Sequence, residues 1–120
     1  MASDIDPVAV EVTEENAAIN AVRLGRGPGA LDTVTAPGLD HARLKARAPY
    51  DLIFANILKG PLIQLAPDLA KSLAAGGKAI LSGILNTQAE DVVLVYKKAG
   101  FSVVSRDEIA EWTTLVLERV

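Results

Sequence analysis

A polar residue at a strand end is the first candidate for chemistry in this sequence. The segment Asp51–Leu58 contains an unbroken apolar run, Leu52–Ala55, and then Asn56, whose side chain carries both donors and acceptors. Such a run predicts a short strand buried on both faces, as in a parallel sheet covered by helices. Ligands of open α/β sheets bind beyond the carboxyl ends of the strands, where Asn56 would lie. The alternative is that the Asn56 side chain only caps the turn.

Two other features of the sequence could be interpreted as functional sites, but we expect both to be ordinary loop segments. Gly25, Gly27 and Gly29 superficially suggest a phosphate-binding loop. That motif needs a strand before the glycines and a helix after them, whereas here the predicted order is reversed, so we expect an ordinary loop. His41 is the only histidine, and it lacks further ligands at metal-binding spacing. We therefore expect a solvated loop residue and no metal site.

Composition limits the classes of function. The 120 residues are enough for one domain, and half of them are hydrophobic. The net charge is −3 and the basic residues do not cluster, so we expect no direct nucleic-acid binding. The absence of cysteine excludes disulfides and thiol catalysis and fits a cytoplasmic location. No apolar run is long enough to span a membrane, so we expect no membrane partner.

The first third of the chain predicts strand, helix, loop and strand. Residues 1–5 read as the end of a strand, after which Asp6 caps a helix with Pro7 at its first position. Val8, Val12 and Ile19 form the apolar stripe of this helix, which ends near residue 20. A short edge strand over residues 30–36 and one or two helical turns over residues 40–46 follow.

The rest of the chain continues the alternation. An amphipathic helix begins at Pro61 and is ended by Gly76 and Gly77, and a buried strand covers residues 78–83. Asn86 caps a helix that stops at Gly100. Two strands complete the pattern, over residues 101–106 and 112–119. The link between them is too short for a crossover helix, so they form an antiparallel hairpin.

This order of elements predicts an α/β fold. Alternating strands and helices indicate a mostly parallel sheet with helices on both faces, here closed by the C-terminal antiparallel hairpin. We expect residues 1–120 to form a single domain. The sequence begins in the middle of such an architecture, because its first strand is only a few residues long.

Particular segments resemble a known family. The quoted stretches are Ser3–Pro7 with Glu15–Ala17 and Asn20, Asp51–Pro61, Leu65–Pro67, Leu81–Leu85 with Gln88–Glu90, and Glu111–Trp112. Together, and above all in the pairing of Ala55–Leu58 with Ser82–Leu85, they resemble the bacterial ribosomal protein L11 methyltransferases. The resemblance covers nearly the whole chain. It implies a Rossmann-like S-adenosylmethionine-dependent methyltransferase sheet.

The resemblance also implies site residues. Asp4 matches the acidic residue that accepts hydrogen bonds from the ribose hydroxyls of S-adenosylmethionine, and Ile5 would lie against the adenine. Asn56 matches a residue beside the methionine part of the cofactor and the incoming amine. Its side-chain carbonyl would orient the amine for in-line attack on the methyl carbon, which makes Asn56 the catalytic candidate. By contrast, Asp6 reads as a helix cap and Asp51 as structural.

The sequence departs from the family at its N-terminal side. A first strand and a Gly-rich loop precede the segment matched by Asp4 in such enzymes, as does a separate substrate-recognition domain, and none of these is present. The chain is then expected to be a truncated, partial methyltransferase domain. Either it is a fragment of a longer protein, or the strands flanking the gap pair directly, or the sheet borrows an edge from another copy.

These expectations give one main function and two alternatives. The main one is a protein N-methyltransferase that acts on lysine or N-terminal amines of a large-subunit ribosomal protein. Cofactor binding by this chain alone should be weak and catalysis inefficient. One alternative is a methyltransferase with another acceptor; glutamine-modifying relatives are disfavoured, because they carry Pro-Pro where Ile57–Leu58 follows Asn56. The other is a non-catalytic α/β module that self-associates through its incomplete sheet.

Overall fold

The computed structural model describes residues 1–120, which divide into two units. Met1–Ala46 form the first unit and Arg47–Val120 the second. No helix in either unit has the length and apolar character needed to cross a membrane. Each unit is described by itself.

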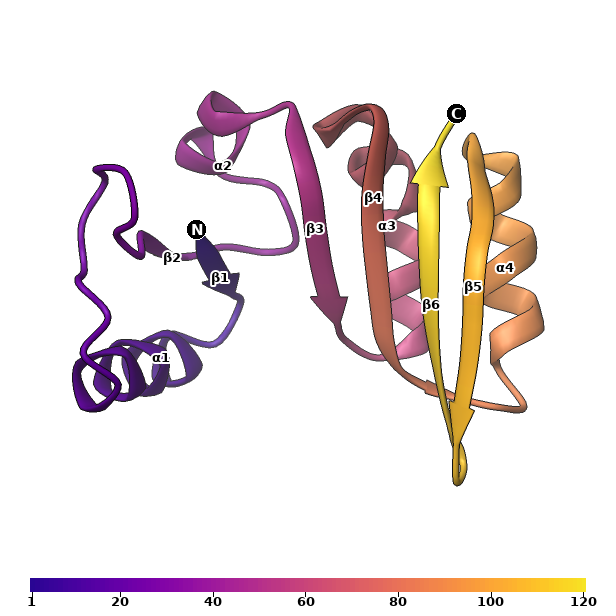
Figure 1. Ribbon diagram of the computed structural model, residues 1–120, viewed down its shortest axis with the longest axis horizontal. Helices are drawn as coiled ribbons and strands as arrows, with labels where there is room; N and C mark the ends of the chain where they lie inside the picture. Colours follow the sequence, from indigo (N-terminus) through magenta and orange to yellow (C-terminus); the bar gives the residue numbers. More distant parts are fainter. The chain divides into compact units, whose positions relative to one another are not determined.

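The first unit is built on two short parallel strands. β1 (Ala2–Asp4) pairs with β2 (Thr33–Thr35), and α1 (Pro7–Ile19) follows β1 (Figure 1). Asp6 caps α1 as predicted, because its Oδ1 accepts the N–H of Val8 at 2.9 Å. The loop that leads from α1 to β2 carries the three glycines, so no helix follows them.

Polar contacts hold this small unit together. The Thr33 hydroxyl donates to Glu14 Oε1 at 2.6 Å, which ties β2 to α1. The short helix α2 (Ala42–Arg47) places Arg43 against the buried Asp32, with which it forms an ion pair. Val34, Ala36 and Leu44 make the small apolar core, with Met1 packed against it.

The predicted apolar stripe of α1 is wrong. Val8, Val12 and Ile19 are all exposed, and Ala17 is the buried residue of this helix. A sheet of two three-residue strands offers too little surface to cover a helix of 13 residues. The stripe is therefore left in contact with solvent.

The second unit contains a four-stranded mixed sheet. Its order is β3 (Tyr50–Asn56), β4 (Leu73–Leu85), β6 (Trp112–Arg119) and β5 (Phe101–Ile109). β3 and β4 are parallel, while β6 runs antiparallel to both of its neighbours. The predicted C-terminal hairpin is confirmed.

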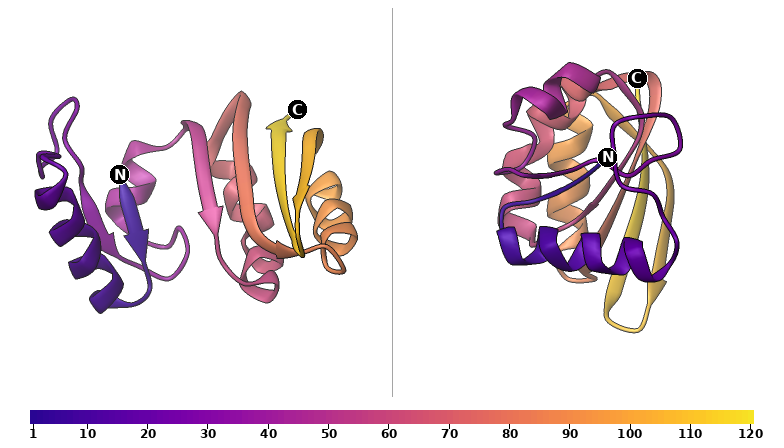
Figure 2. Two further views of the ribbon diagram at one scale, coloured as in Figure 1. Left: turned by 60° about the horizontal axis from the view of Figure 1, so that its bottom comes forward. Right: turned by 90° about the vertical axis from the view of Figure 1, so that its left-hand side faces the viewer.

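Two helices cover one face of this sheet. α3 (Lys59–Ser72) and α4 (Ala89–Lys98) lie on the same side of the strands (Figures 1 and 2). The expectation of helices on both faces is not met within this unit, since α1 and α2 belong to the other one. The largest apolar and aromatic side chains buried in this unit are Leu62, Leu69, Leu73, Leu81, Ile84, Val92, Tyr96, Leu115 and Leu117.

Tyr96 brings a phenol hydroxyl into this core. Its hydroxyl donates to the carbonyl oxygen of Leu62 at 2.8 Å, which joins α4 to α3, and its ring packs against Phe101 at 5.4 Å between centroids. Burial raises the pKa of the Tyr96 phenol well above its ordinary value. The hydrogen bond satisfies a group that would otherwise be costly to bury.

Two boundaries differ from the sequence prediction. α3 ends at Ser72, before Gly76 and Gly77, because the chain is already extended at Leu73, where β4 begins. Asn86 does not cap α4. Gln88 stands at the cap position, with no side-chain cap bond.

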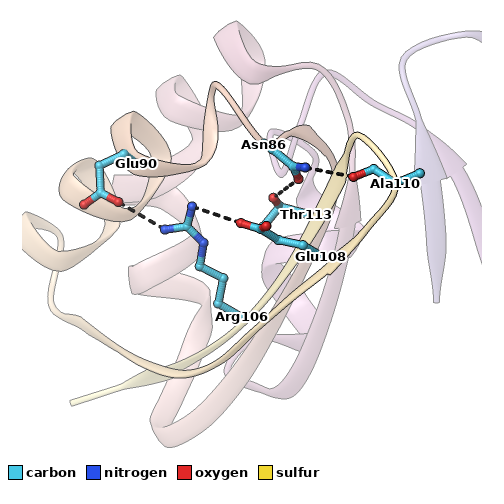
Figure 3. A network of polar contacts seen from close by, with 6 residues as sticks. All are labelled: Asn86, Glu90, Arg106, Glu108, Ala110 and Thr113. Atoms are coloured by element: carbon cyan, nitrogen blue, oxygen red, sulfur yellow. Dashed lines mark hydrogen bonds and ion pairs between the residues drawn. The ribbon is translucent and has the colours of Figure 1, made fainter.

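Asn86 instead joins the strand end to the hairpin. Its Nδ2 donates to the carbonyl oxygen of Ala110 at 2.9 Å, and its Oδ1 accepts from the buried Thr113 hydroxyl (Figure 3). Nearby, Arg106 of β5 contacts Glu90 and Glu108 at the surface.

The prediction that β3 is buried on both faces is wrong. Leu52 and Phe54 are exposed, by 47% and 72%, and Ala55 is the buried residue of the strand. The cause is the position of β3 at the edge of its sheet, with α3 and α4 on one face only. β1 and β3 belong to separate sheets.

Candidate functional site

Asn56 lies at the carboxyl end of β3, as predicted. It is the last residue of the strand, its side chain is exposed, and it pairs in register with Ser82 of β4. Because β3 and β4 are parallel, the segments 56–58 and 82–85 lie at the same edge of the sheet. The structure thus brings together the two segments whose pairing carried the resemblance.

Gly83 determines the space available to Asn56. It has a φ of +77°, and a Cβ placed on it would collide with Asn56 Oδ1 and lie 3.6 Å from Asn56 Cγ. The Asn56 carboxamide therefore occupies the room that a side chain at residue 83 would need. Sequence reasoning assigned Gly83 no role, although a lone glycine inside a strand signals a bulge or a close approach.

Asp4 ends β1 in the first unit. Its carboxylate is exposed, and its Oδ1 accepts the backbone N–H of Asp6 at 2.9 Å. An ionised carboxylate has about four lone-pair sites, so further acceptor positions remain after this one bond. The neighbouring Ile5 is 70% exposed and offers an apolar surface beside the carboxylate.

The three candidate residues fall in different units. Asp4 and Ile5 are adjacent in the first, and Asn56 belongs to the second. Each lies at or next to the carboxyl end of a parallel strand. In the first unit the Asp4 carboxylate offers hydrogen-bond acceptors beside the apolar Ile5, and in the second the Asn56 carboxamide offers both a donor and an acceptor.

Other titratable groups contribute little to this chemistry. His41 Nδ1 accepts the N–H of Arg43 at 3.1 Å, a local contact at the start of α2. Tyr50 starts β3, at the end opposite to Asn56, and burial raises its pKa while the Arg47 charge opposes this rise. No three His, Cys, Asp or Glu side chains come together as a metal site.

Comparison with known proteins places the chain in a family. The model for "Ribosomal protein L11 methyltransferase (PrmA)" matches residues 1–120. The ribosomal protein L11 methyltransferase of Chelativorans sp. (strain BNC1) is 45% identical over 119 residues, which are 99% of this chain and 39% of that protein. The chain thus spans about two fifths of the length of the curated relatives it matches.

Solved structures agree in fold. A ribosomal protein L11 methylase from Lactobacillus delbrueckii subsp. bulgaricus superposes with a TM-score of 0.83 at 27% identity, covering 98% of this chain and 56% of that one. The N-methyltransferase NodS from Bradyrhizobium japonicum, in complex with S-adenosyl-L-homocysteine, has a TM-score of 0.69 at 16% identity, covering 98% and 64%. The second likeness shows the fold alone. The chain belongs to the ribosomal protein L11 methyltransferase family.

Proposed function

We propose that this chain forms part of an S-adenosylmethionine-dependent protein methyltransferase. Its acceptors would be lysine side-chain or N-terminal amines of a large-subunit ribosomal protein. The names of its relatives, which specify ribosomal protein L11, support the ribosomal acceptor. The observation that carries the proposal is Asn56, an exposed carboxamide at the carboxyl end of a parallel strand, seated in the space left by Gly83.

The two units would belong to one partial methyltransferase domain spanning residues 1–120. This is supported by the single family match, which runs through both units without a break. A ribosomal substrate and the absence of cysteine both favour the cytoplasm as the place of action.

Asp4 and Ile5 would hold the nucleoside part of the cofactor. The Asp4 carboxylate can accept the hydrogen bonds of two ribose hydroxyls, because only one of its acceptor positions is used by the N–H of Asp6. The exposed Ile5 would cover one face of the adenine. The relative NodS was solved with S-adenosyl-L-homocysteine, which supports a cofactor of this class.

Asn56 would position the acceptor amine. S-adenosylmethionine supplies, when bound, a methyl group on a positively charged sulfur. The carboxamide of Asn56 can accept an N–H of a neutral amine and thereby direct its lone pair, while water takes up the proton. Alignment of this kind is the main contribution a protein makes to such a displacement.

The direct test is calorimetric titration with S-adenosyl-L-homocysteine. We expect weak but saturable binding by the isolated chain. Loss of hydrogen bonds to a charged group costs about 1.5–3 kcal/mol, so Asp4→Asn should weaken binding by roughly 10- to 150-fold. Asp68→Asn removes an exposed carboxylate from α3 and is the matched control, which should bind as the unmodified chain does.

Two results would count against the proposal. Equal binding by the Asp4→Asn and Asp68→Asn variants would remove Asp4 from the site. Absence of binding by a well-folded chain would mean that a cofactor site requires segments beyond these residues. Methyl transfer to an acceptor other than a ribosomal protein would retain the enzyme class and change the substrate.

A second candidate function is self-association without catalysis. The observation that favours it is the edge position of β3, whose exposed Leu52 and Phe54 lie on a strand without lysine or proline to discourage pairing. Two copies could pair their β3 edges around a twofold axis. Analytical ultracentrifugation should then show a dimer that Phe54→Lys dissociates; a monomer at high concentration would exclude this function.

A further inference from the structure

The side chain of Asn56 stands where a side chain at residue 83 would have to be placed. The atoms closest to a Cβ built on Gly83 belong to the Asn56 side chain, and the nearest backbone atom, the carbonyl oxygen of Ile57, is 3.8 Å away. The contact at Gly77 is different, since the backbone oxygen of Ala74 stands nearest there, at 2.8 Å. The space that a Cβ at residue 83 would need is thus occupied by one side chain, that of Asn56.

The local irregularity of β4 creates this arrangement. Ser82 and Gly83 together lie opposite the single Thr114 of β6, so the ladder contains a bulge at this point. The positive φ of Gly83 belongs to the bulge, and positive φ is unfavourable for residues with a Cβ. Ser82, the first residue of the bulge, is also the residue that pairs with Asn56.

We infer that Gly83 is a positioning residue for Asn56, which holds the carboxamide in its working orientation by leaving it the space of a side chain. The functional meaning of this inference rests on the proposed role of Asn56. A methyl group at residue 83 would force the carboxamide to rotate away. Asn56 would remain in the chain but no longer meet the amine and cofactor correctly.

The chain contains a matched control for this inference. Gly76 lies in the same strand with the same φ of +77°, and nothing stands within 4 Å of a Cβ built on it. Gly76→Ala and Gly83→Ala therefore both place a Cβ at a positive φ of the same size, and only Gly83→Ala adds the collision with Asn56. The difference between the two variants isolates the contact.

The first readout is the side-chain NH₂ signal pair of Asn56 in a ¹H–¹⁵N spectrum, assigned from its absence in Asn56→Ala. Gly83→Ala should shift this pair, and Gly76→Ala should leave it in place. An unmoved Asn56 signal in Gly83→Ala would overturn the inference. This readout needs no cofactor, so it stands even if the proposed function fails.

The second readout is rescue by a second substitution. Gly83→Ala should lower the melting temperature more when Asn56 is present than in the Asn56→Ala background. Equal losses in the two backgrounds would show that the glycine is required by the backbone conformation alone. If Gly83→Ala does not fold, recovery of folding in the double variant provides the same test. Where S-adenosyl-L-homocysteine binds, Gly83→Ala should weaken it as much as Asn56→Ala, with no further loss in the double variant.

Discussion

The buried hydroxyl of Thr113 donates a 2.7 Å hydrogen bond to Oδ1 of Asn86 (Figure 3). The bond connects β6 with the segment that follows β4, and the Asn86 amide continues it to Ala110 in the hairpin turn. The C-terminal hairpin is thereby anchored next to the strand end that precedes α4.

Asn86→Ala tests this anchor. The substitution leaves the Thr113 hydroxyl buried without an acceptor, so we expect the free energy of unfolding to fall by about 1–3 kcal/mol. Urea unfolding measures the loss. Thr113→Val should reduce the effect of Asn86→Ala when the two are combined, since the orphaned hydroxyl is then gone. Simple additivity of the two losses would show that they act independently.

The hairpin turn itself can be improved. Ala110 has a φ of +53°, a conformation that costs an L-residue roughly 1–2 kcal/mol. Ala110→Gly removes that strain but adds freedom to the unfolded chain, so we expect a net gain of about 0.5–1 kcal/mol. Ala70→Gly, inside α3, is the control and should destabilise by a similar amount. A loss of stability from Ala110→Gly would contradict the assigned turn conformation.

Tyr96→Phe tests the bond between α3 and α4. The ring keeps its contact with Phe101 while the hydroxyl bond to the Leu62 carbonyl is lost, so we expect a cost of about 1 kcal/mol near neutral pH. Chemical denaturation of both proteins gives the value. A cost of zero would mean that the hydroxyl is solvated in solution.

The same pair of proteins gives a pH dependence. The pKa of Tyr96 is raised by burial, so its neutral form is favoured in the folded state, and the stabilisation is complete below the ordinary pKa of 10.0. Above pH 10 unfolding releases a proton from this phenol, and stability falls by about 1.4 kcal/mol per pH unit. Tyr96→Phe lacks this component, so its disadvantage should shrink above pH 10 and change sign by about pH 11.5. A constant difference over that range would refute the assignment.

Asp6→Ala tests the start of α1. It removes the acceptor of the Val8 N–H, and loss of such a cap costs about 1 kcal/mol. Asp6→Asn keeps a capping oxygen and should retain most of the stability. Thermal unfolding followed by circular dichroism distinguishes the two. Equal losses would indicate that the charge of Asp6, and not its capping geometry, matters.

Much of the architecture could be predicted from periodicity and turn residues. The alternation of apolar runs with amphipathic segments gave the order of elements, and the short link after β5 required the hairpin. The exposure of Phe54 could not be predicted, because an apolar run does not reveal whether a neighbouring strand lies on both sides of it. Asn86 shows a similar limit, since a short polar side chain after a strand can cap a helix or reach across to another strand.

The candidate site was predictable in part. Asn56 followed from its place after an apolar run, but Asp4 and Ile5 followed only from the family resemblance, because a carboxylate before a capping Asp looks like a turn residue. The role of Gly83 depends on a contact between residues 27 positions apart, which local sequence cannot disclose.

The most direct test of the central claim is a ¹H–¹⁵N titration of the isolated chain with S-adenosyl-L-homocysteine. The account predicts saturable shifts of the backbone signals of Asp4 and Ile5 in the first unit and of Asn56 and Gly83 in the second. Saturable shifts confined to other residues, or no shifts in a folded chain, would contradict the claim that these residues bind the cofactor.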